Sequence, residues 1–484
     1  MKLYEASIKE LKELYKRGEA SPGQVVDELL QRIDRLNPEL NAFITVDRDK
    51  VYDQTRQAEG MLGKRDAPPL CGIPIAVKDI FTTSGMRTTC ASKILEGFVP
   101  PYDATVIRKL KEAGAVIVGK TNMDEFAMGS STETSYFGPT RNPWAFDAVP
   151  GGSSGGSASA VAADMAFGAL GTDTGGSIRQ PAALCGIAGL KPTYGRVSRY
   201  GMIAFASSLD QGGTMTRTVY DSALLLETIA GFDPLDSTSA DMPVEPFTQM
   251  LAHPKGVRIG VPGEYFVEGM DKEVQASIEK ARDTMKGLGA RIVDISLPHT
   301  KYAVAVYYIL ASSEASSNLA RYDGVKYGYR SASGADLIGM YMDTRAKGFG
   351  REVKRRIMLG TFALSAGYYS EFYGKAQRAR RLIKQDFDDA FGQCDVILAP
   401  TSPTPAFRLG SRLDDPLQMY LSDIFTIPLN LAGLPGISIP CGFTKEGLPI
   451  GMQLIGRRFD EKTVLSVANM YEQATPWHER TPAI

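Results

Sequence analysis

Two glycine-rich turns carry the serines of this chain that could do chemistry. The first, PGGSSGGS at residues 150–157, precedes a run of small residues with high helix propensity, so backbone N–H groups gather at the start of a helix. The second, GTDTGGSIRQP at residues 171–181, follows an apolar run that ends at Leu170. This order places Ser177 just beyond the end of a strand, where its hydroxyl group could act as a nucleophile.

The second turn also has the composition of an oxyanion hole. Glycines tolerate the dihedral angles that such a turn needs, and several N–H groups could then point to one spot and stabilise a developing negative charge. The residues expected to donate are Thr174, Gly175, Gly176 and Ser177.

Two other interpretations of the glycine-rich segments have less support. A flexible Gly/Ser linker is seldom followed at once by a small-residue helix and a buried strand. A phosphate loop would need the pattern GxxxxGK[ST], or a GxGxxG turn with an acidic residue about 20 positions further on, and the sequence contains neither. Nucleotide binding by these turns is therefore not expected.

A serine nucleophile needs a base, and Lys78 is the leading candidate. None of the three histidines stands beside either turn, so a Ser-His-Asp triad has no support. Lys78 ends the apolar run IPIAV at residues 73–77, where a charged ammonium group would be costly. Burial lowers the pKa of a lysine until its neutral amine can accept a proton. The alternative is a strand-end lysine that pairs with the adjacent Asp79.

An α/β framework must position these residues. From residue 70 onward, short apolar runs bounded by Gly and Pro are typical of buried strands, and helical stretches such as residues 271–288 lie between several of them. This alternation predicts a large, mostly parallel or mixed sheet with helices on both faces. The predicted strands lie in GIPIAVKDI, AGAVIVGK, ADMAFGALGTDT, GVRIGVP, ARIVDISL, CDVILAP, LPGISIPCGF and LPIGMQLIG.

The N-terminal segment, about residues 5–37, predicts two amphipathic helices. Ser7 with Glu10, and Ser21 with Gln24, match the capping-box pattern that begins a helix. This helical pair could cover the core or could dock a partner.

Composition and charge narrow the class of protein. The 54 Lys and Arg residues are balanced by 55 Asp and Glu, so the chain lacks the positive excess that carries non-specific nucleic-acid binding. The first residues do not form a basic segment followed by an apolar one, and the sequence has no apolar run of 18 residues. We therefore expect a cytoplasmic protein that does not bind membranes.

Five scattered cysteines without CxxC spacing predict no metal site. No repeat or low-complexity linker divides the chain, so we expect one domain over residues 1–484.

Three motifs together resemble the amidase-signature family: GIPIAVKDI at residues 72–80, GGSSGGSA at 151–158 and GTDTGGSIRQPA at 171–182. The resemblance spans most of the chain and implies one α/β/α fold around a large mixed sheet.

The same resemblance implies a Ser-Ser-Lys triad. Ser177 would be the nucleophile, Ser153 the bridging serine, and Lys78 the base that draws a proton through Ser153. The Gly152–Ser153 peptide bond would be cis. Ammonia would leave from an amide, and water would then resolve the acyl-enzyme.

Four further stretches resemble the branch of this family that works in glutamine-dependent aspartyl/glutamyl-tRNA amidotransferases. They are MDEFAMGSSTETS at residues 123–135, GLKPTYGRVSRYG at 189–201, SSEASSNLARYDGVKYG at 312–328 and GFGREVKRRIMLGTFALS at 348–365.

For that branch the resemblance implies a glutaminase whose ammonia passes through a tunnel to a partner subunit. The partner uses ATP and Mg to convert Glu-tRNA(Gln) and/or Asp-tRNA(Asn). Expected partners are glutamine, subunits B and C in a heterotrimer, and misacylated tRNA held mainly by a partner subunit. No cofactor is expected in this chain.

Glutamine recognition is carried over to Arg356, Asp423 and Tyr307. A free amino acid needs a cation for its carboxylate and an anion for its ammonium group, which Arg356 and Asp423 would supply, with Tyr307 nearby. Alternatives stay open for each residue. Arg356 belongs to a Lys-Arg-Arg run, so it could face solvent, and the neighbouring Arg355 could bind instead. Asp423 could cap a helix, and Tyr307 could be an ordinary core residue.

Two rival functions remain. A free-standing amidase would act on another small carboxamide with the same triad but without obligate partners. A non-catalytic scaffold subunit would keep only the fold, and the presence of Ser177, Ser153 and Lys78 weighs against it.

Overall fold

A single mixed sheet runs through the part of the chain that the computed structural model describes, residues 2–64, 66–267, 269–333 and 336–484. Within these residues the sheet has 11 strands in the order β1-β3-β2-β4-β6-β5-β10-β11-β9-β7-β8. The strands are β1 Phe43–Thr45, β2 Pro74–Lys78, β3 Val116–Thr121, β4 Gly168–Thr172, β5 Ala188–Lys191, β6 Gly212–Thr216, β7 Arg258–Pro262, β8 Arg291–Ile295, β9 Val396–Pro400, β10 Gly436–Phe443 and β11 Pro449–Gly456.

Strand direction changes along this sheet. β2 lies between β3 and β4 and is parallel to both. From β4 through β6, β5, β10 and β11 to β9, each neighbour is antiparallel, whereas β9, β7 and β8 are again parallel. The predicted mixed α/β sheet is therefore confirmed, and one of its two parallel parts contains the strand that ends at Lys78.

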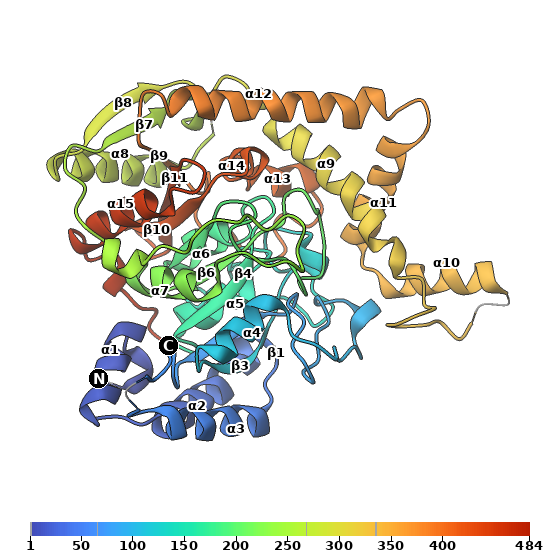
Figure 1. The fold of residues 1–484 in the computed structure, drawn as a ribbon. Coiled ribbons are helices and arrows are strands. Elements are labelled where there is room, and N and C mark those ends of the chain that lie inside the picture. Colours follow the sequence, from blue (N-terminus) through green and yellow to red (C-terminus); the bar gives the residue numbers. More distant parts are fainter. Residues whose placement is uncertain (1, 65, 268, 334–335) are drawn as a thin grey trace.

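Helices surround the sheet along its length (Figure 1). In this view α1, α2 and α3 lie at the lower end, α12 crosses the top, and α10 stands out from the body on the right. The helices are α1 Ile8–Arg17, α2 Pro22–Leu40, α3 Arg48–Met61, α4 Thr105–Glu112, α5 Gly155–Ala162, α6 Arg179–Cys185, α7 Val219–Ile229, α8 Lys272–Gly287, α9 Ala303–Asn318, α10 Leu337–Gly348, α11 Arg351–Leu364, α12 Lys375–Ala390, α13 Pro416–Leu421, α14 Ile427–Ala432 and α15 Glu461–Gln473.

Each of the eight predicted strands is present, as β2, β3, β4, β7, β8, β9, β10 and β11. The predicted helix at residues 271–288 is α8, whose N-cap Asp271 accepts the N–H groups of Glu273 and Val274. The short strands β1, β5 and β6 were not predicted. β5 and β6 contain Gly, Thr and Lys in place of continuous apolar runs, which explains why their pattern is weak.

The N-terminal helices begin as predicted. Both capping boxes are formed, by Ser7 with Glu10 in α1 and by Ser21 with Gln24 in α2. The second helix continues to Leu40, past the expected end near residue 37. Asp221 of α7 accepts the backbone N–H groups of the first two residues of α1, so the N-terminal helix packs on the body of the protein.

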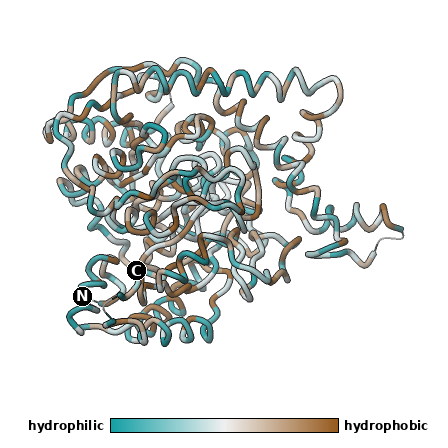
Figure 2. The backbone as a smooth tube through the Cα atoms, viewed as in Figure 1, coloured by the Kyte–Doolittle hydropathy of each residue, from teal (hydrophilic) through white to brown (hydrophobic). Residues whose placement is uncertain are grey.

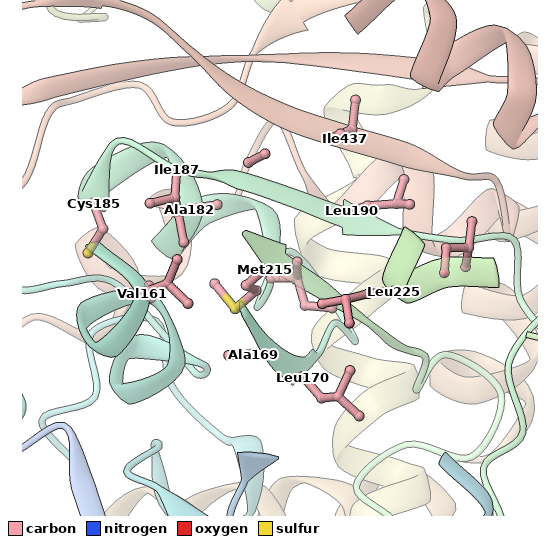
Figure 3. Packing of buried hydrophobic residues seen from close by; sticks show 14 of the residues in the cluster. Val161, Ala169, Leu170, Ala182, Cys185, Ile187, Leu190, Met215, Leu225 and Ile437 are labelled. Atoms are coloured by element: carbon pink, nitrogen blue, oxygen red, sulfur yellow. The ribbon is translucent and has the colours of Figure 1, made fainter. Parts of the chain in front are cut away.

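The hydrophobic core follows the strands. Figure 2 shows hydrophobic segments inside the molecule and a mostly hydrophilic α12 along its top edge. Figure 3 shows Met215 of β6 meeting Val161 of α5 and Ala182 of α6, whereas Leu170 of β4 lies on the side of Leu225 of α7. All five side chains are fully buried. Among the described helices, none is both long and apolar enough to cross a membrane.

Close packing between α5 and the residues that follow β3 leads to a test of the fold. A Cβ at Gly156 would lie 2.4 Å from the carbonyl oxygen of Asn122 and 2.6 Å from that of Ala42. Gly156→Ala should therefore overpack this contact and lower the free energy of unfolding by about 1–3 kcal/mol. Gly60 in α3 has no described atom within 4 Å of its Cβ position. Gly60→Ala should raise stability by up to about 1 kcal/mol through helix propensity.

Midpoints of thermal unfolding of the two variants and of the wild type check this prediction. A Gly156→Ala midpoint at or above that of Gly60→Ala would contradict it.

Candidate active site

Lys78 lies fully buried at the end of β2, in contact with three hydroxyl groups. Its Nζ lies 2.7 Å from Ser153 Oγ, 2.9 Å from Ser154 Oγ and 2.8 Å from Thr172 Oγ1. Burial lowers the pKa of Lys78 to about 7, although nearby carboxylates oppose the shift. The amine is therefore uncharged in a large fraction of molecules near neutral pH.

The alternative pairing of Lys78 with Asp79 is not observed. The Asp79 carboxylate lies 3.6 Å from Nζ of Lys120, a second buried lysine, and accepts the backbone N–H of Thr89 at 2.9 Å. Lys120 therefore neutralises Asp79, and the amine of Lys78 is left to the hydroxyl groups.

The hydrogen bonds around Lys78 orient its lone pair. Ser154 Oγ donates to the backbone oxygen of Thr172 at 3.1 Å, so it accepts from Lys78. A neutral amine has two hydrogens and one lone pair. When its hydrogens go to Ser154 and Thr172, the lone pair points to the hydroxyl of Ser153, which can then give up a proton to it.

Ser153 and Ser177 lie on two turns that contact each other. The N–H of Ser154 donates to the backbone oxygen of Ser177 at 3.2 Å, which joins the turns. The Gly152–Ser153 peptide bond is cis, as the family resemblance implies. Ser153 is fully buried, whereas Ser177 is 8% exposed. The more accessible serine is thus the one predicted to be the nucleophile.

The second turn leaves fewer free donors than its sequence indicates. The N–H of Gly176, one of the four expected oxyanion donors, already donates to Asp173 Oδ1 at 2.8 Å. Among the described residues, the N–H groups of Thr174, Gly175 and Ser177 have no protein acceptor. These three remain available to a developing oxyanion.

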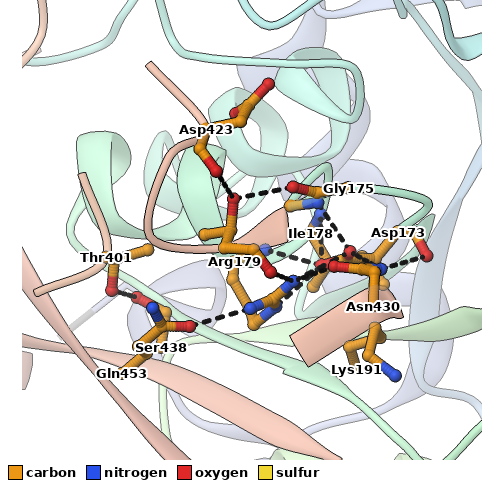
Figure 4. A network of polar contacts seen from close by, with 12 residues as sticks. Asp173, Gly175, Ile178, Arg179, Lys191, Thr401, Asp423, Asn430, Ser438 and Gln453 are labelled. Atoms are coloured by element: carbon orange, nitrogen blue, oxygen red, sulfur yellow. Dashed lines mark hydrogen bonds and ion pairs between the residues drawn. The ribbon is translucent and has the colours of Figure 1, made fainter. Parts of the chain in front are cut away.

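Asp173 and Arg179 form a fully buried ion pair that anchors this turn (Figure 4). Arg179 Nε lies 3.0 Å from Asp173 Oδ2, and Arg179 also donates to Asn430 Oδ1 at 2.6 Å and to Gln453 Oε1 at 2.8 Å. Although burial alone would raise it, the pKa of Asp173 falls to about 2 because the guanidinium lies beside it. Thr426 adds a bond to the Gly175 oxygen at 2.7 Å.

Tyr307 packs against Gly175 and leaves no room for a side chain at that position. A Cβ at Gly175 would lie 2.7 Å from the Tyr307 ring, so any larger residue would collide with it. Tyr307 is 5% exposed and belongs to α9. It therefore packs directly on the turn that carries the predicted nucleophile.

Asp423 is buried and does not cap a helix. Its carboxylate accepts a hydrogen bond from Ser130 Oγ, while the following helix α14 begins after Thr426 without a side-chain cap. Burial raises the pKa of Asp423 to about 7, against the effect of the Ser130 bond. In the described structure Asp423 Oδ1 has no hydrogen-bond partner, so one carboxylate oxygen is left for another donor.

Arg356 is buried rather than solvated, at 3% exposure. Its Nε donates to Glu352 Oε1 at 2.8 Å, and its guanidinium lies 5.0 Å from the ring centre of Tyr308. The side chain of Arg355 is 29% exposed. This difference favours Arg356 over its neighbour as a binding group.

Arg356 and Ser130 line one cavity of about 290 Å³. Glu125, Ser131, Glu352 and Tyr420 also line it. The cavity adjoins the first turn, because a Cβ at Gly152 would lie 2.6 Å from the backbone nitrogen of Ser131. A space of this size, with a cation on one wall, suits a small charged molecule.

Sequence reasoning missed several groups of this site. Ser154 and Thr172 contact Lys78, and Ser130 binds Asp423, yet none of them was singled out. Asp173 and Arg179 lie within a recognised motif but had no predicted role. Opposite charges six positions apart in a Gly-rich, otherwise apolar segment were the available signal.

In the described structure, His299 and His253 form side-chain hydrogen bonds with groups other than the two serines. His299 Nδ1 contacts Asp386 at 2.7 Å, and His253 Nε2 contacts the backbone oxygen of Leu288. This agrees with the expectation that histidine is not the base.

The mixed α/β sheet thus places a buried lysine, with its pKa lowered to about 7, beside two serine-bearing turns, an arrangement that could activate a serine nucleophile. The chain matches the family model described as Amidase over residues 24–465. It therefore belongs to the Amidase family.

Relatives within the family are similar over the full chain. The A subunits of glutamyl-tRNA(Gln) amidotransferase from Geotalea daltonii and Thermodesulfovibrio yellowstonii are 57% and 58% identical over 485 residues, covering 100% of both chains. The crystal structure of the A subunit of the same amidotransferase from Thermotoga maritima has a TM-score of 0.82 at 45% identity. That comparison covers 98% of this chain and 96% of the other.

The buried ion pair yields a prediction about the turn. Arg179→Met should leave Asp173 charged and uncompensated and lower the free energy of unfolding by about 3–5 kcal/mol. In contrast, Arg258 and Asp395 form a pair with 35% and 32% of their side chains exposed. Arg258→Met should cost far less, because solvent screens this exposed pair. Thermal unfolding compares the two, and equal midpoints would contradict the assigned role of the buried pair.

Proposed function

We propose that this chain is the glutaminase subunit of a tRNA-dependent amidotransferase. The observation that carries the proposal is the buried amine of Lys78, 2.7 Å from Ser153 Oγ, beside the turn of Ser177. An amine with its pKa lowered to about 7 can act as a base at neutral pH.

In the proposed mechanism, Lys78 takes the proton of Ser153 while Ser153 takes that of Ser177. Ser177 Oγ attacks the carbon of the side-chain amide of glutamine and forms a tetrahedral intermediate. The proton then returns through Ser153 to the amide nitrogen, the C–N bond breaks and ammonia leaves. Water, deprotonated by the same route, attacks the acyl carbon. The bond from this carbon to Ser177 Oγ then breaks, the proton returns through Ser153 to Ser177 Oγ, and glutamate is released.

The free N–H groups of Thr174, Gly175 and Ser177 would stabilise the oxyanion of both intermediates. The Asp173–Arg179 pair would keep this turn in place without contacting the reacting atoms.

Glutamine would bind through the two charged groups of its α-carbon. Arg356 would pair with the α-carboxylate and Asp423 with the α-ammonium group, and Tyr307 would border the site beside the catalytic turn. Two observations support this assignment: Arg356 lines the cavity, and Asp423 Oδ1 has no hydrogen-bond partner in the described structure.

The full-length similarity to the A subunits of amidotransferases supports a proposal for the reaction partners. Subunits B and C would complete a cytoplasmic heterotrimer. A partner subunit would hold the misacylated tRNA and use ATP and Mg to convert Glu-tRNA(Gln) and/or Asp-tRNA(Asn) to Gln-tRNA(Gln) and Asn-tRNA(Asn). The near-neutral charge of this chain is consistent with tRNA binding mainly elsewhere.

Ser177→Ala and Lys78→Ala should each abolish hydrolysis of glutamine without unfolding the protein, because both side chains serve the reaction. Ammonia release by the complex purified from its native cell measures this, with misacylated tRNA and ATP present or absent. Stimulation by tRNA in the wild type supports the amidotransferase. Turnover of other amides without glutamine hydrolysis would indicate a free-standing amidase, and activity retained in either variant would contradict the triad.

The pKa of Lys78 predicts the pH dependence of kcat. Because the pKa is lowered to about 7, the amine becomes neutral, and active as a base, as the pH rises through that value. With saturating glutamine, kcat should therefore rise with pH between about 6 and 8. A kcat that stays constant across this range would argue against Lys78 as the base. Titration of Asp423 should change KM for glutamine rather than kcat, because its carboxylate binds the substrate.

A further inference from the structure

Glu125 is a buried residue whose carboxylate joins two other segments of the chain. It begins a short 3-10 turn, Glu125–Ala127, and is 2% exposed. Its Oε2 accepts the backbone N–H of Gly350 at 2.8 Å, and its Oε1 accepts a hydrogen bond from Ser92 Oγ. Both carboxylate oxygens therefore bind groups from distant parts of the chain.

The bond to Gly350 replaces a local helix cap. Gly350 is the N-cap of α11 and has no side chain to cap it, and the third residue of the helix is Val353, which cannot reach back with a polar group. In α1 that reach-back bond comes from Glu10. Glu125, 225 residues earlier in the chain, supplies it for α11. Burial raises the pKa of Glu125 to about 7, so the contact does not require a full negative charge.

Gly350 allows this close approach. A Cβ at this position would lie 2.3 Å from Glu125 Oε2, so even alanine would push the helix and the carboxylate apart.

Arg356 also belongs to α11, so its position depends on that of the helix. Glu352, also on α11, holds the Arg356 guanidinium through the 2.8 Å bond and accepts from Tyr420 Oη at 2.9 Å. A shift of the start of α11 would therefore move the guanidinium along the cavity wall.

Glu125 is also joined through the backbone to the loop that carries Ser130, another residue that lines the cavity. Asp124 directly precedes it, donates its N–H to the backbone oxygen of Ser153 at 3.3 Å, and accepts the N–H of Thr132 at 2.9 Å. The loop held in this way carries Ser130, which binds Asp423. Glu125 thus links helix α11, which carries Arg356, to the loop that carries Ser130.

We infer that Glu125 is a positioning residue, which sets the separation between Arg356 and the Ser130–Asp423 pair that the two charged groups of glutamine require. The inference rests on the proposed function, because it assigns these groups to glutamine. It adds a residue that does not itself contact the reacting atoms.

The test compares Glu125→Ala with Glu125→Gln in the complex purified with its native partner subunits. Glu125→Ala should raise KM for glutamine by about tenfold or more with kcat within about threefold of the wild type, since misplacement of a binding group weakens substrate binding. Glu125→Gln keeps an oxygen for the Gly350 N–H and an amide group for Ser92, so its KM should stay within about threefold of the wild type.

Asp221→Ala is the matched control. Asp221 is also a fully buried carboxylate at a helix N-terminus, where it accepts the N–H groups of Ile8 and Lys9 at 3.0 and 3.1 Å. Its removal should lower the thermal unfolding midpoint as Glu125→Ala does, but without the rise in KM. If KM of Glu125→Ala is unchanged, or rises equally in both variants, Glu125 has only a structural role and the inference fails.

Gly350→Ala provides a second variant in case Glu125→Ala does not fold. It keeps the carboxylate but displaces the start of α11, and it should also raise KM more than kcat changes. An unchanged KM in Gly350→Ala overturns the inference. Absence of glutamine hydrolysis in the wild type overturns the proposed function together with the inference, whereas an active wild type with unaffected variants overturns the inference alone.

Discussion

The chemistry proposed for this site depends on the burial of the Lys78 amine, which favours its uncharged form. A buried ammonium group without a partner is strongly unfavourable, so the interior shifts the pKa of Lys78 to about 7. Ser154 and Thr172 then take hydrogen bonds from the amine and leave its lone pair to Ser153. A solvated lysine at the same strand end would stay protonated and could not accept a proton.

The sheet brings the parts of this site to one edge. β2 and β4 are parallel neighbours, so Lys78 and Thr172, the last residues of these strands, lie side by side at their carboxyl ends. The turn with Ser177 follows β4 directly. Because β4 cannot move without β2, the position of the turn relative to the amine is determined by backbone hydrogen bonds, and the Asp173–Arg179 pair then holds its shape.

The cavity beside the turns is assembled differently. Its walls come from loops and helices far apart in the chain, and buried polar contacts hold them together. Ser130 binds Asp423, Glu125 binds the start of α11, and Arg356 is held by Glu352. Such networks are costly when only partly satisfied, so each member constrains the others. The reactive edge is thus supported by strands, whereas the cavity depends on long-range polar contacts.

Local patterns in the sequence determined the capping boxes of α1 and α2, the helix α8 and the eight strands with clear apolar runs, because these depend on neighbouring residues. The glycine-rich turn after an apolar run likewise indicated Ser177, the apolar run before Lys78 indicated that lysine, and the family resemblance added Ser153. The strands β5 and β6 escaped prediction because their hydrophobic pattern is weak and neighbouring strands stabilise them. Only the tertiary structure separated Lys78 from Asp79, committed the Gly176 N–H to Asp173 and joined Glu125 to α11, since these outcomes depend on three-dimensional packing that local pattern does not encode.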